Sequence, residues 1–201
     1  MDYPSNITLA EVCLTITSRE ACVVSALIAV GAVTRVGLGQ LALGVPIPLY
    51  GVMIKVGLTE TLAFVSGFVF GPAMGFLCGA MIIVISDILM IPGPWTLFIA
   101  AIVGIFGLGG AVIRLFRRDP SPLILGAFAV LFTLLSELLQ NVWFALSFNV
   151  PILGALVMGV PSILTAIANN VVLLTLVGAK VIRLIENTNP KSSSATRVRN
   201  P

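Results

Sequence analysis

Residues 70–95 read FGPAMGFLCGAMIIVISDILMIPGPW, and this stretch sets the organisation of the whole chain. Its middle is almost entirely apolar and is long enough for one membrane-spanning helix, which needs about 20 apolar residues. Gly71-Pro72 marks the start, because glycine suits a helix end and proline the first turn of the next helix. Gly75 and Gly79 are four residues apart, a spacing of small residues that lets two helices approach closely. The stretch therefore predicts a membrane helix over about 73–91, joined to the preceding helix in a tight hairpin.

The composition extends this prediction to the whole protein. The chain has 201 residues, of which 58% are hydrophobic and 9% charged, and its mean hydropathy is +1.13. Soluble domains carry about 25% charged residues. In lipid only helices and closed barrels satisfy their backbone groups, and barrel strands would alternate over roughly ten residues. The long unbroken apolar runs instead predict an all-α polytopic membrane protein, a six-helix transmembrane bundle.

Apolar runs place the six helices along the chain. The predicted spans cover about 21–43, 57–70, 73–91, 95–115, 122–147 and 152–183. A loop or re-entrant piece is expected at 44–56, and Pro161 should bend the sixth helix because proline removes one backbone hydrogen bond. The predicted organisation is a cytoplasmic segment at 1–20, the transmembrane domain at 21–185, and a disordered basic cytoplasmic tail at 186–201.

The cations predict the orientation, because Lys and Arg accumulate in cytoplasmic flanks. With the N-terminus inside, the exterior flanks hold only Lys55, and Arg35 lies within the first span. The cytoplasmic flanks hold Arg19, Arg114, Arg117, Arg118, Lys180, Arg183, Lys191, Arg197 and Arg199. This bias predicts a multi-pass protein of the inner or plasma membrane with both termini in the cytoplasm.

Several functional classes have no signature in the chain. The net charge of +3 resides in short flanks between apolar runs, which argues against a nucleic-acid partner. Three cysteines without paired spacing and no histidine give no indication of a metal site. No GxxxxGK[ST], HExxH or GxSxG motif occurs. We therefore expect no cofactor, no enzymatic activity and no ATPase of the chain's own, so that energy comes from partners or gradients.

Three ionisable residues fall within the predicted spans: Arg35, Asp87 and Glu137. Each would cost about 2.5–3.5 kcal/mol against lipid, so they should face the bundle interior. At 1.5 Å per residue all three lie roughly 20 Å from the cytoplasmic ends of their helices. Arg35 could form a structural ion pair with either acid. The other acid must then be protonated or find a cationic partner, and the second option favours a ligand with positive or hydrogen-donating character.

Further polar and aromatic residues are expected near this level. Gln140 and Asn141 share the face of Glu137 at i+3 and i+4, and Trp143 lies nearer the exterior. The predicted ligand-binding residues are Arg35, Tyr50, Asp87, Trp95, Glu137, Gln140, Asn141, Asn169 and Asn170. Two alternatives stay open: Tyr50 and Trp95 as interfacial belt residues, and Asn169-Asn170 as an interhelical hydrogen-bond clamp. Together these residues predict an outward-opening pocket with aromatic walls.

The glycine-rich stretch carries a family resemblance. Its residues are Phe70-Gly71-Pro72, Gly75-Phe76, Gly79-Ala80 and Ser86-Asp87, then Gly93-Pro94-Trp95-Thr96, Gly104, Gly107 and Gly109. The pattern resembles the substrate-binding (S) subunits of energy-coupling-factor transporters, in the branch labelled cobalamin-type. The resemblance implies capture of a vitamin or similar micronutrient. It also implies docking onto a transmembrane coupling subunit and two ATPase subunits.

In that family a stripe of small residues on the first helix, usually AxxxA, holds the coupling subunit. The residues implied here for docking are Ala21, Ser25, Ala26 and Ala29. Ala21, Ser25 and Ala29 give AxxxSxxxA instead, and Ala26 forms CxxxA with Cys22 beside them. Ala32 continues the stripe, and ordinary packing within the bundle is the alternative interpretation. The alternative functions are a standalone secondary transporter or channel, an intramembrane enzyme using Asp87 and Glu137, and a structural membrane subunit of an envelope complex.

Overall fold

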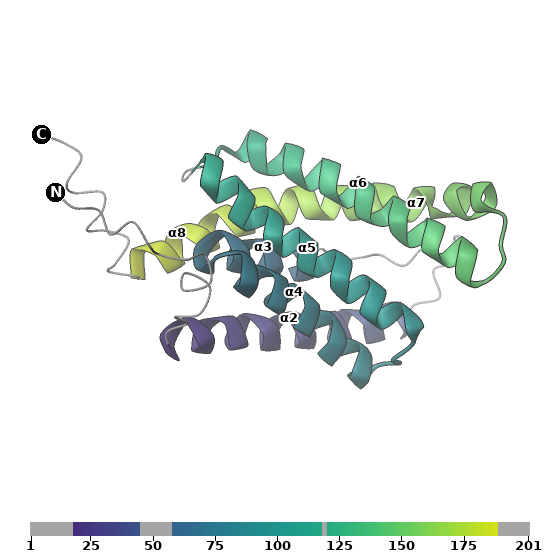
Figure 1. Cartoon of the computed structure of the whole chain (residues 1–201), viewed down its shortest axis with the longest axis horizontal. Coiled ribbons are helices and arrows are strands. Elements are labelled where there is room, and N and C mark those ends of the chain that lie inside the picture. The colour runs from purple at the N-terminus through teal and green to yellow at the C-terminus, as the bar shows by residue number, and fades with distance from the viewer. Residues whose placement is uncertain (1–17, 45–57, 118–119, 189–201) are drawn as a thin grey trace, which may run out of the picture.

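The computed structural model describes residues 18–44, 58–117 and 120–188, and in these ranges the chain is helical apart from short turns. The elements are α2 (Ser18–Gly44), α3 (Leu58–Phe70), α4 (Pro72–Leu89), α5 (Pro94–Phe116), α6 (Pro122–Ser147), α7 (Ile152–Val172), η1 (Leu173–Gly178) and α8 (Ala179–Thr188). Five helical segments are long and apolar enough to cross a membrane. The protein is therefore an all-α, multi-pass membrane protein, as predicted (Figure 1).

The predicted helices agree with the observed ones to within a few residues. The sixth is one apolar rod, Ile152–Leu184, that contains Pro161 and the π-helical segment η1. The predicted loop at 44–56 and the predicted tail lie mostly outside the described residues. The second helix, α3, lies within one residue of its predicted bounds and has 13 residues. At 1.5 Å per residue it is about 20 Å long, shorter than the roughly 30 Å hydrocarbon core.

Helix α3 forms the buried centre of the bundle. Ten of its 13 residues are buried, and the side chains of Phe64 and Phe68 are fully enclosed. It contacts α2, α4 and α5, and it also contacts η1 and α8. Its last carbonyls are capped by Arg114 of α5, which donates to Phe68 O at 2.8 Å and also to Val69 O. A cation beside a helix C-terminus is favourable, so Arg114 stabilises the end of this short helix.

Glycine allows α3, α4 and α5 to touch through their backbones. A Cβ atom added to Gly67 would lie 1.9 Å from the Gly107 carbonyl oxygen, and one added to Gly75 would lie 2.5 Å from Gly67 Cα. Gly71 joins α3 to α4 with φ 102° and ψ 176°, a region that is essentially restricted to glycine. The predicted hairpin is thus present, and α5 is a third helix in the same backbone contact.

Helices α5 and α6 are consecutive in the chain, and they contact each other through aromatic side chains rather than through their backbones. The ring centroid of Phe106 lies 5.2 Å from that of Phe128 and 5.0 Å from that of Phe132. Helix α6 instead packs along α7, and these two helices lie side by side in Figure 1. The bundle therefore has a first part, α2–α5, in which glycines join α3, α4 and α5, and a second part, α6–α8, with side chains filling the junction.

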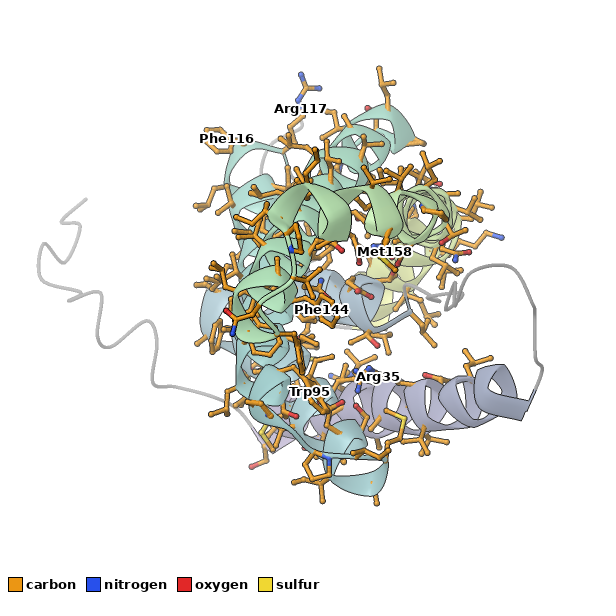
Figure 2. The ribbon with its side chains drawn as sticks, turned by 90° about the vertical axis from the view of Figure 1, so that its right-hand side faces the viewer. Arg35, Trp95, Phe116, Arg117, Phe144 and Met158 are labelled. Atoms are coloured by element: carbon orange, nitrogen blue, oxygen red, sulfur yellow. The ribbon has the colours of Figure 1, made fainter. Side chains whose placement is uncertain are left out.

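The described cations are unequally distributed between the two ends of the bundle. Since consecutive helices run in opposite directions, the start of α2, the α5–α6 turn and α8 lie at one end (Figure 1). That end carries Arg19, Arg114, Arg117, Lys180 and Arg183. Among the described residues, Arg35 is the single cation in the other half. The α4–α5 and α6–α7 turns lie at this opposite end, which Figure 2 views directly.

Candidate functional site

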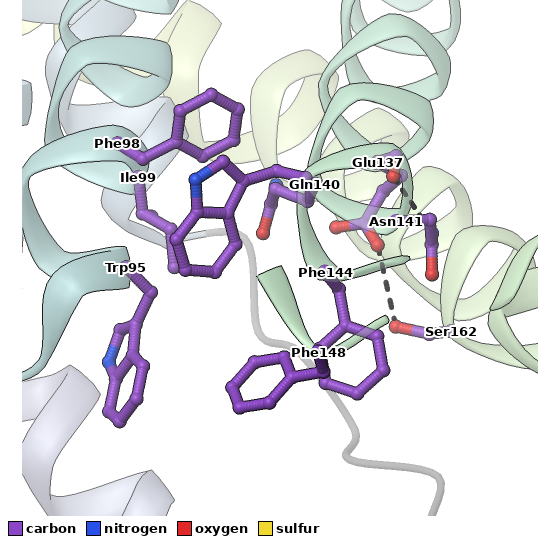
Figure 3. Close-up of a pocket in the computed structure, with 10 residues that line it drawn as sticks. Trp95, Phe98, Ile99, Glu137, Gln140, Asn141, Phe144, Phe148 and Ser162 are labelled. Carbon is purple, nitrogen blue, oxygen red and sulfur yellow. Dashed lines mark hydrogen bonds between the residues drawn. The ribbon is translucent and has the colours of Figure 1, made fainter. Parts of the chain in front are cut away.

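A cavity of about 370 Å³ opens between α5, α6 and α7 near the end with few cations. Its wall combines the first turns of α5, the last three turns of α6, and one residue of α7 (Figure 3). It is lined by Trp95, Phe98, Ile99, Glu137, Gln140, Asn141, Trp143, Phe144, Phe148 and Ser162. Small-molecule sites have this size and this mixture of aromatic walls with a few polar groups.

The α6 residues reach the cavity because of their helical spacing. Gln140, Asn141 and Phe144 follow Glu137 at i+3, i+4 and i+7, so all four lie on one face of the helix. Phe148 follows directly after the helix and completes this face. Trp95 reaches the same cavity from α5, so four predicted site residues line it: Trp95, Glu137, Gln140 and Asn141.

Glu137 is the acidic group of the cavity wall and is 4% exposed. Its Oε2 atom lies 3.5 Å from the Ser162 hydroxyl of α7, which donates to it. The Asn141 side chain is fixed beside it, because Asn141 Nδ2 donates to the Glu137 backbone carbonyl at 2.8 Å. On the α7 side, a Cβ atom added to Gly159 would lie 2.4 Å from Asn141 Oδ1. Gly159 thus provides the space that the Asn141 amide occupies.

Aromatic rings form most of the remaining wall. Phe98 of α5 stacks on Trp143 of α6 with centroids 5.3 Å apart and planes 18° apart. Phe144 and Phe148 contact each other at 4.8 Å. Trp95 lies across the cavity from this second pair in Figure 3. The rings line the cavity from two helices, with the Glu137 carboxylate on the side nearest α7.

Arg35 and Asp87 form a separate polar cluster that joins α2, α4 and α5. The Arg35 guanidinium donates to Asp87 Oδ1 and to the Ser86 hydroxyl. The Thr96 hydroxyl donates to Asp87 Oδ2 at 2.7 Å, and it accepts from the Gly93 backbone N–H at 3.1 Å. Asp87 is 3% exposed, and Arg35 is its ion-pair partner. The buried carboxylate is therefore paired with a cation inside the protein. None of these residues lines the cavity, although Thr96 directly follows Trp95.

The other predicted site residues lie elsewhere. Asn170 is buried and its Nδ2 atom donates to the Thr133 hydroxyl of α6 at 2.8 Å. This bond matches the alternative interpretation as an interhelical clamp. Asn169 is half-buried and does not line the cavity. Tyr50 lies outside the described residues.

Five cavity residues were not predicted: Phe98, Ile99, Phe144, Phe148 and Ser162. Phe144 continues the Glu137 face by one more turn of helix, and this spacing was an available signal. Ser162 follows Pro161 within α7. The two α5 residues carry no comparable signal, because apolar residues on a membrane helix face lipid as readily as a cavity.

Within the described parts of the chain, no three His, Cys, Asp or Glu residues are grouped so that they could hold a metal ion. Cys22 is exposed and Cys78 is buried, so they lie in different environments. No family model, curated protein or solved structure matches this chain.

Proposed function

We propose that the protein captures a small molecule from the exterior as the substrate-binding subunit of an energy-coupling-factor importer. The observation that carries this proposal is the cavity between α5, α6 and α7, where Glu137, Gln140 and Asn141 meet aromatic walls. The ligand is a vitamin or a similar micronutrient, and the site is in the chain rather than in a partner.

The orientation supports capture from outside. Because cations mark the cytoplasmic side, the end with Arg19, Arg117 and Lys180 faces the cytoplasm. The cavity lies toward the opposite end and would then open to the exterior of the inner or plasma membrane. The absence of a nucleotide-binding motif in the sequence agrees with ATPases supplied as separate subunits.

The outer face of α2 supports docking onto a coupling subunit. Ala21, Ser25, Ala26 and Ala29 are all exposed, whereas Val24 on another face packs against α3 and α4. Ala32, which was grouped with the stripe, is 2% exposed and belongs to the core instead. Small exposed side chains allow a partner helix to approach closely within the bilayer.

The first test is purification of the tagged chain from native membranes. We expect a coupling subunit and two ATPase subunits to co-purify, and native mass spectrometry should detect one small molecule per protein. Recovery of a lone, ligand-free chain would contradict the proposal.

The second test separates docking from binding. Ser25→Trp and Ala29→Trp should reduce uptake by ten- to a hundredfold, because overpacking at a helix contact costs about 1–3 kcal/mol. Ligand binding should be unchanged, since the cavity contains no α2 residue among those described. Leu38→Trp is the matched control, because Leu38 is 39% exposed and no residue of the stripe lies three or four positions from it in α2. Normal uptake by both variants would show that the stripe only contacts lipid.

A standalone secondary transporter is the second candidate, favoured by the interruptions in the last rod. Pro161 and the π-helical segment η1 break the regular hydrogen bonding there, and broken helices are typical of such transporters. Gradient-driven transport by the purified chain in liposomes, without ATPases, would decide in its favour.

A further inference from the structure

The two sides of the cavity differ in chemistry. Helix α5 contributes Trp95, Phe98 and Ile99, and none of these side chains carries a carboxyl, hydroxyl or amide group. Every such group of the described wall comes from α6 or α7, as in Asn141 and Ser162. A ligand that matches this wall therefore has an apolar body on the α5 side and a polar edge on the α6–α7 side.

Aromatic side chains are half of the residues that line the cavity, and they are packed in place without a ligand. Phe98 stacks on Trp143 with centroids 5.3 Å apart and planes 18° apart, and Phe144 contacts Phe148 at 4.8 Å. Trp95 lies across the cavity from this second pair (Figure 3). Because packed rings have little freedom to lose on binding, they offer preformed flat surfaces to a ligand.

Trp95 is positioned by the turn between α4 and α5. A Cβ atom added to Gly93 would lie 2.4 Å from Cη2 of the Trp95 indole, so glycine leaves the space that this ring occupies. The hydroxyl of the next residue, Thr96, donates to Asp87 Oδ2 at 2.7 Å, and Asp87 pairs with Arg35. The ion pair therefore holds the start of α5, and Trp95 with it, without lining the cavity.

The size of the cavity limits the ligand. Its volume of about 370 Å³ lies at the small end of ligand sites. A ligand of about one or two fused rings suits such a volume. A flat ring also has few rotatable bonds, and each bond that is immobilised on binding lowers the affinity.

We propose that the ligand of this cavity carries a flat aromatic ring, which lies between Trp95 of α5 and Phe144 of α6 with a polar edge toward α7. This assignment rests on the proposed capture function and names the class of its substrate. Aromatic rings attract each other in offset-stacked or edge-to-face arrangements, beyond the effect of the area that they bury. The wall therefore selects an aromatic ring over a saturated ring of the same size.

The test compares two neutral probes, benzamide and cyclohexanecarboxamide, which carry the same amide group on an aromatic and on a saturated ring. The full chain, purified in detergent, is titrated with each probe while its tryptophan emission is recorded. Tryptophan octyl ester in empty micelles corrects for non-specific quenching. Both tryptophans of the chain line the cavity, so a saturable change reports binding there. We expect benzamide to bind at least about fivefold more tightly, because each aromatic contact contributes about two- to tenfold in affinity beyond the buried area.

The variant test removes one ring of the wall and keeps both tryptophans. Phe144→Leu should weaken benzamide binding by about three- to tenfold, because the aromatic contact is lost. The affinity for cyclohexanecarboxamide should change by less than about twofold, since leucine preserves an apolar contact. Phe116→Leu is the matched control, because Phe116 is 81% exposed at the other end of α5. Its affinities should equal those of the wild type.

Equal or tighter binding of cyclohexanecarboxamide would overturn the ring assignment and leave the capture function standing, because burial of apolar area alone does not favour the aromatic probe. An unchanged benzamide affinity in Phe144→Leu would overturn the assignment, and so would the absence of saturable binding by both probes. In these cases a co-purified molecule in native mass spectrometry decides separately whether the protein captures a ligand. The comparison of the two probes uses the wild-type chain, so it holds even if Phe144→Leu fails to fold.

Discussion

Gly67→Ala is expected to destabilise the protein by about 3 kcal/mol, at the upper end of the usual range for overpacked sites. The added Cβ would lie 1.9 Å from the Gly107 carbonyl oxygen and 2.9 Å from its carbon. Both are backbone atoms, so no side chain can rotate away and α3 must move from α5. The measurement is the midpoint of thermal unfolding in detergent, which should fall by about 2–4 °C per kcal/mol for a chain of this size.

Gly37→Ala provides the matched control for this prediction. Gly37 lies in α2 with no atom within 4 Å of an added Cβ. The same substitution there should stabilise the helix by up to about 1 kcal/mol, because alanine is the better helix former. The two variants therefore have opposite expected signs. An unchanged midpoint for Gly67→Ala would show that α3 and α5 are not in backbone contact.

Arg35→Met is expected to cost about 3 kcal/mol, because removing one partner of a buried pair leaves the other charge uncompensated. Asp87 is 3% exposed, whereas the Arg35 side chain is 26% exposed. Loss of the arginine should therefore be more harmful than Asp87→Asn, which leaves the charge on the more accessible partner. Unfolding midpoints of both variants in the same detergent test this order.

The double variant Arg35→Met/Asp87→Asn completes a mutant cycle. It contains no buried charge at this position, and the new amide can still accept from the Thr96 hydroxyl that now bonds to Asp87 Oδ2. We expect it to be more stable than Arg35→Met alone, which is a strongly non-additive result. Additive effects of the two substitutions would contradict a coupled ion pair.

The helices were predictable because the bilayer restricts their length and polarity so strongly. Long apolar runs between Gly71-Pro72 and the other turns gave helix bounds within a few residues of those observed. The central position of α3 was not predictable in the same way. Its 13 residues are apolar whether they face lipid or protein, so hydropathy alone does not identify it as the buried helix.

For each candidate site residue, the sequence predicted its level along the helix but not the way its side chain points. Counting residues along each helix placed Arg35 and Asp87 at one level, and they do form an ion pair. The count contains no information on the rotation of each helix about its axis. Asp87 therefore points toward α2 and Thr96, whereas Glu137 points toward α5 and α7. One predicted polar recess is thus two separate clusters.

Spacing within a single helix was more informative than depth. Gln140 and Asn141 were assigned to the Glu137 face from their i+3 and i+4 positions, and all three line the cavity. Phe98 and Ile99 were missed because their role depends on a neighbouring helix. The local sequence does not distinguish an apolar residue that faces a neighbouring helix from one that faces lipid.

The length of α3 has a consequence for the biogenesis of the protein. A helix of about 20 Å is too short to remain across a bilayer of about 30 Å without thinning it, and Thr59, Thr61 and Ser66 are among its buried residues. Such a segment gains its favourable surroundings only when α4 and α5 have been synthesised and Arg114 can reach its last carbonyls. Nascent chains that end between α3 and α5 should leave this segment accessible to water, and later chains should protect it.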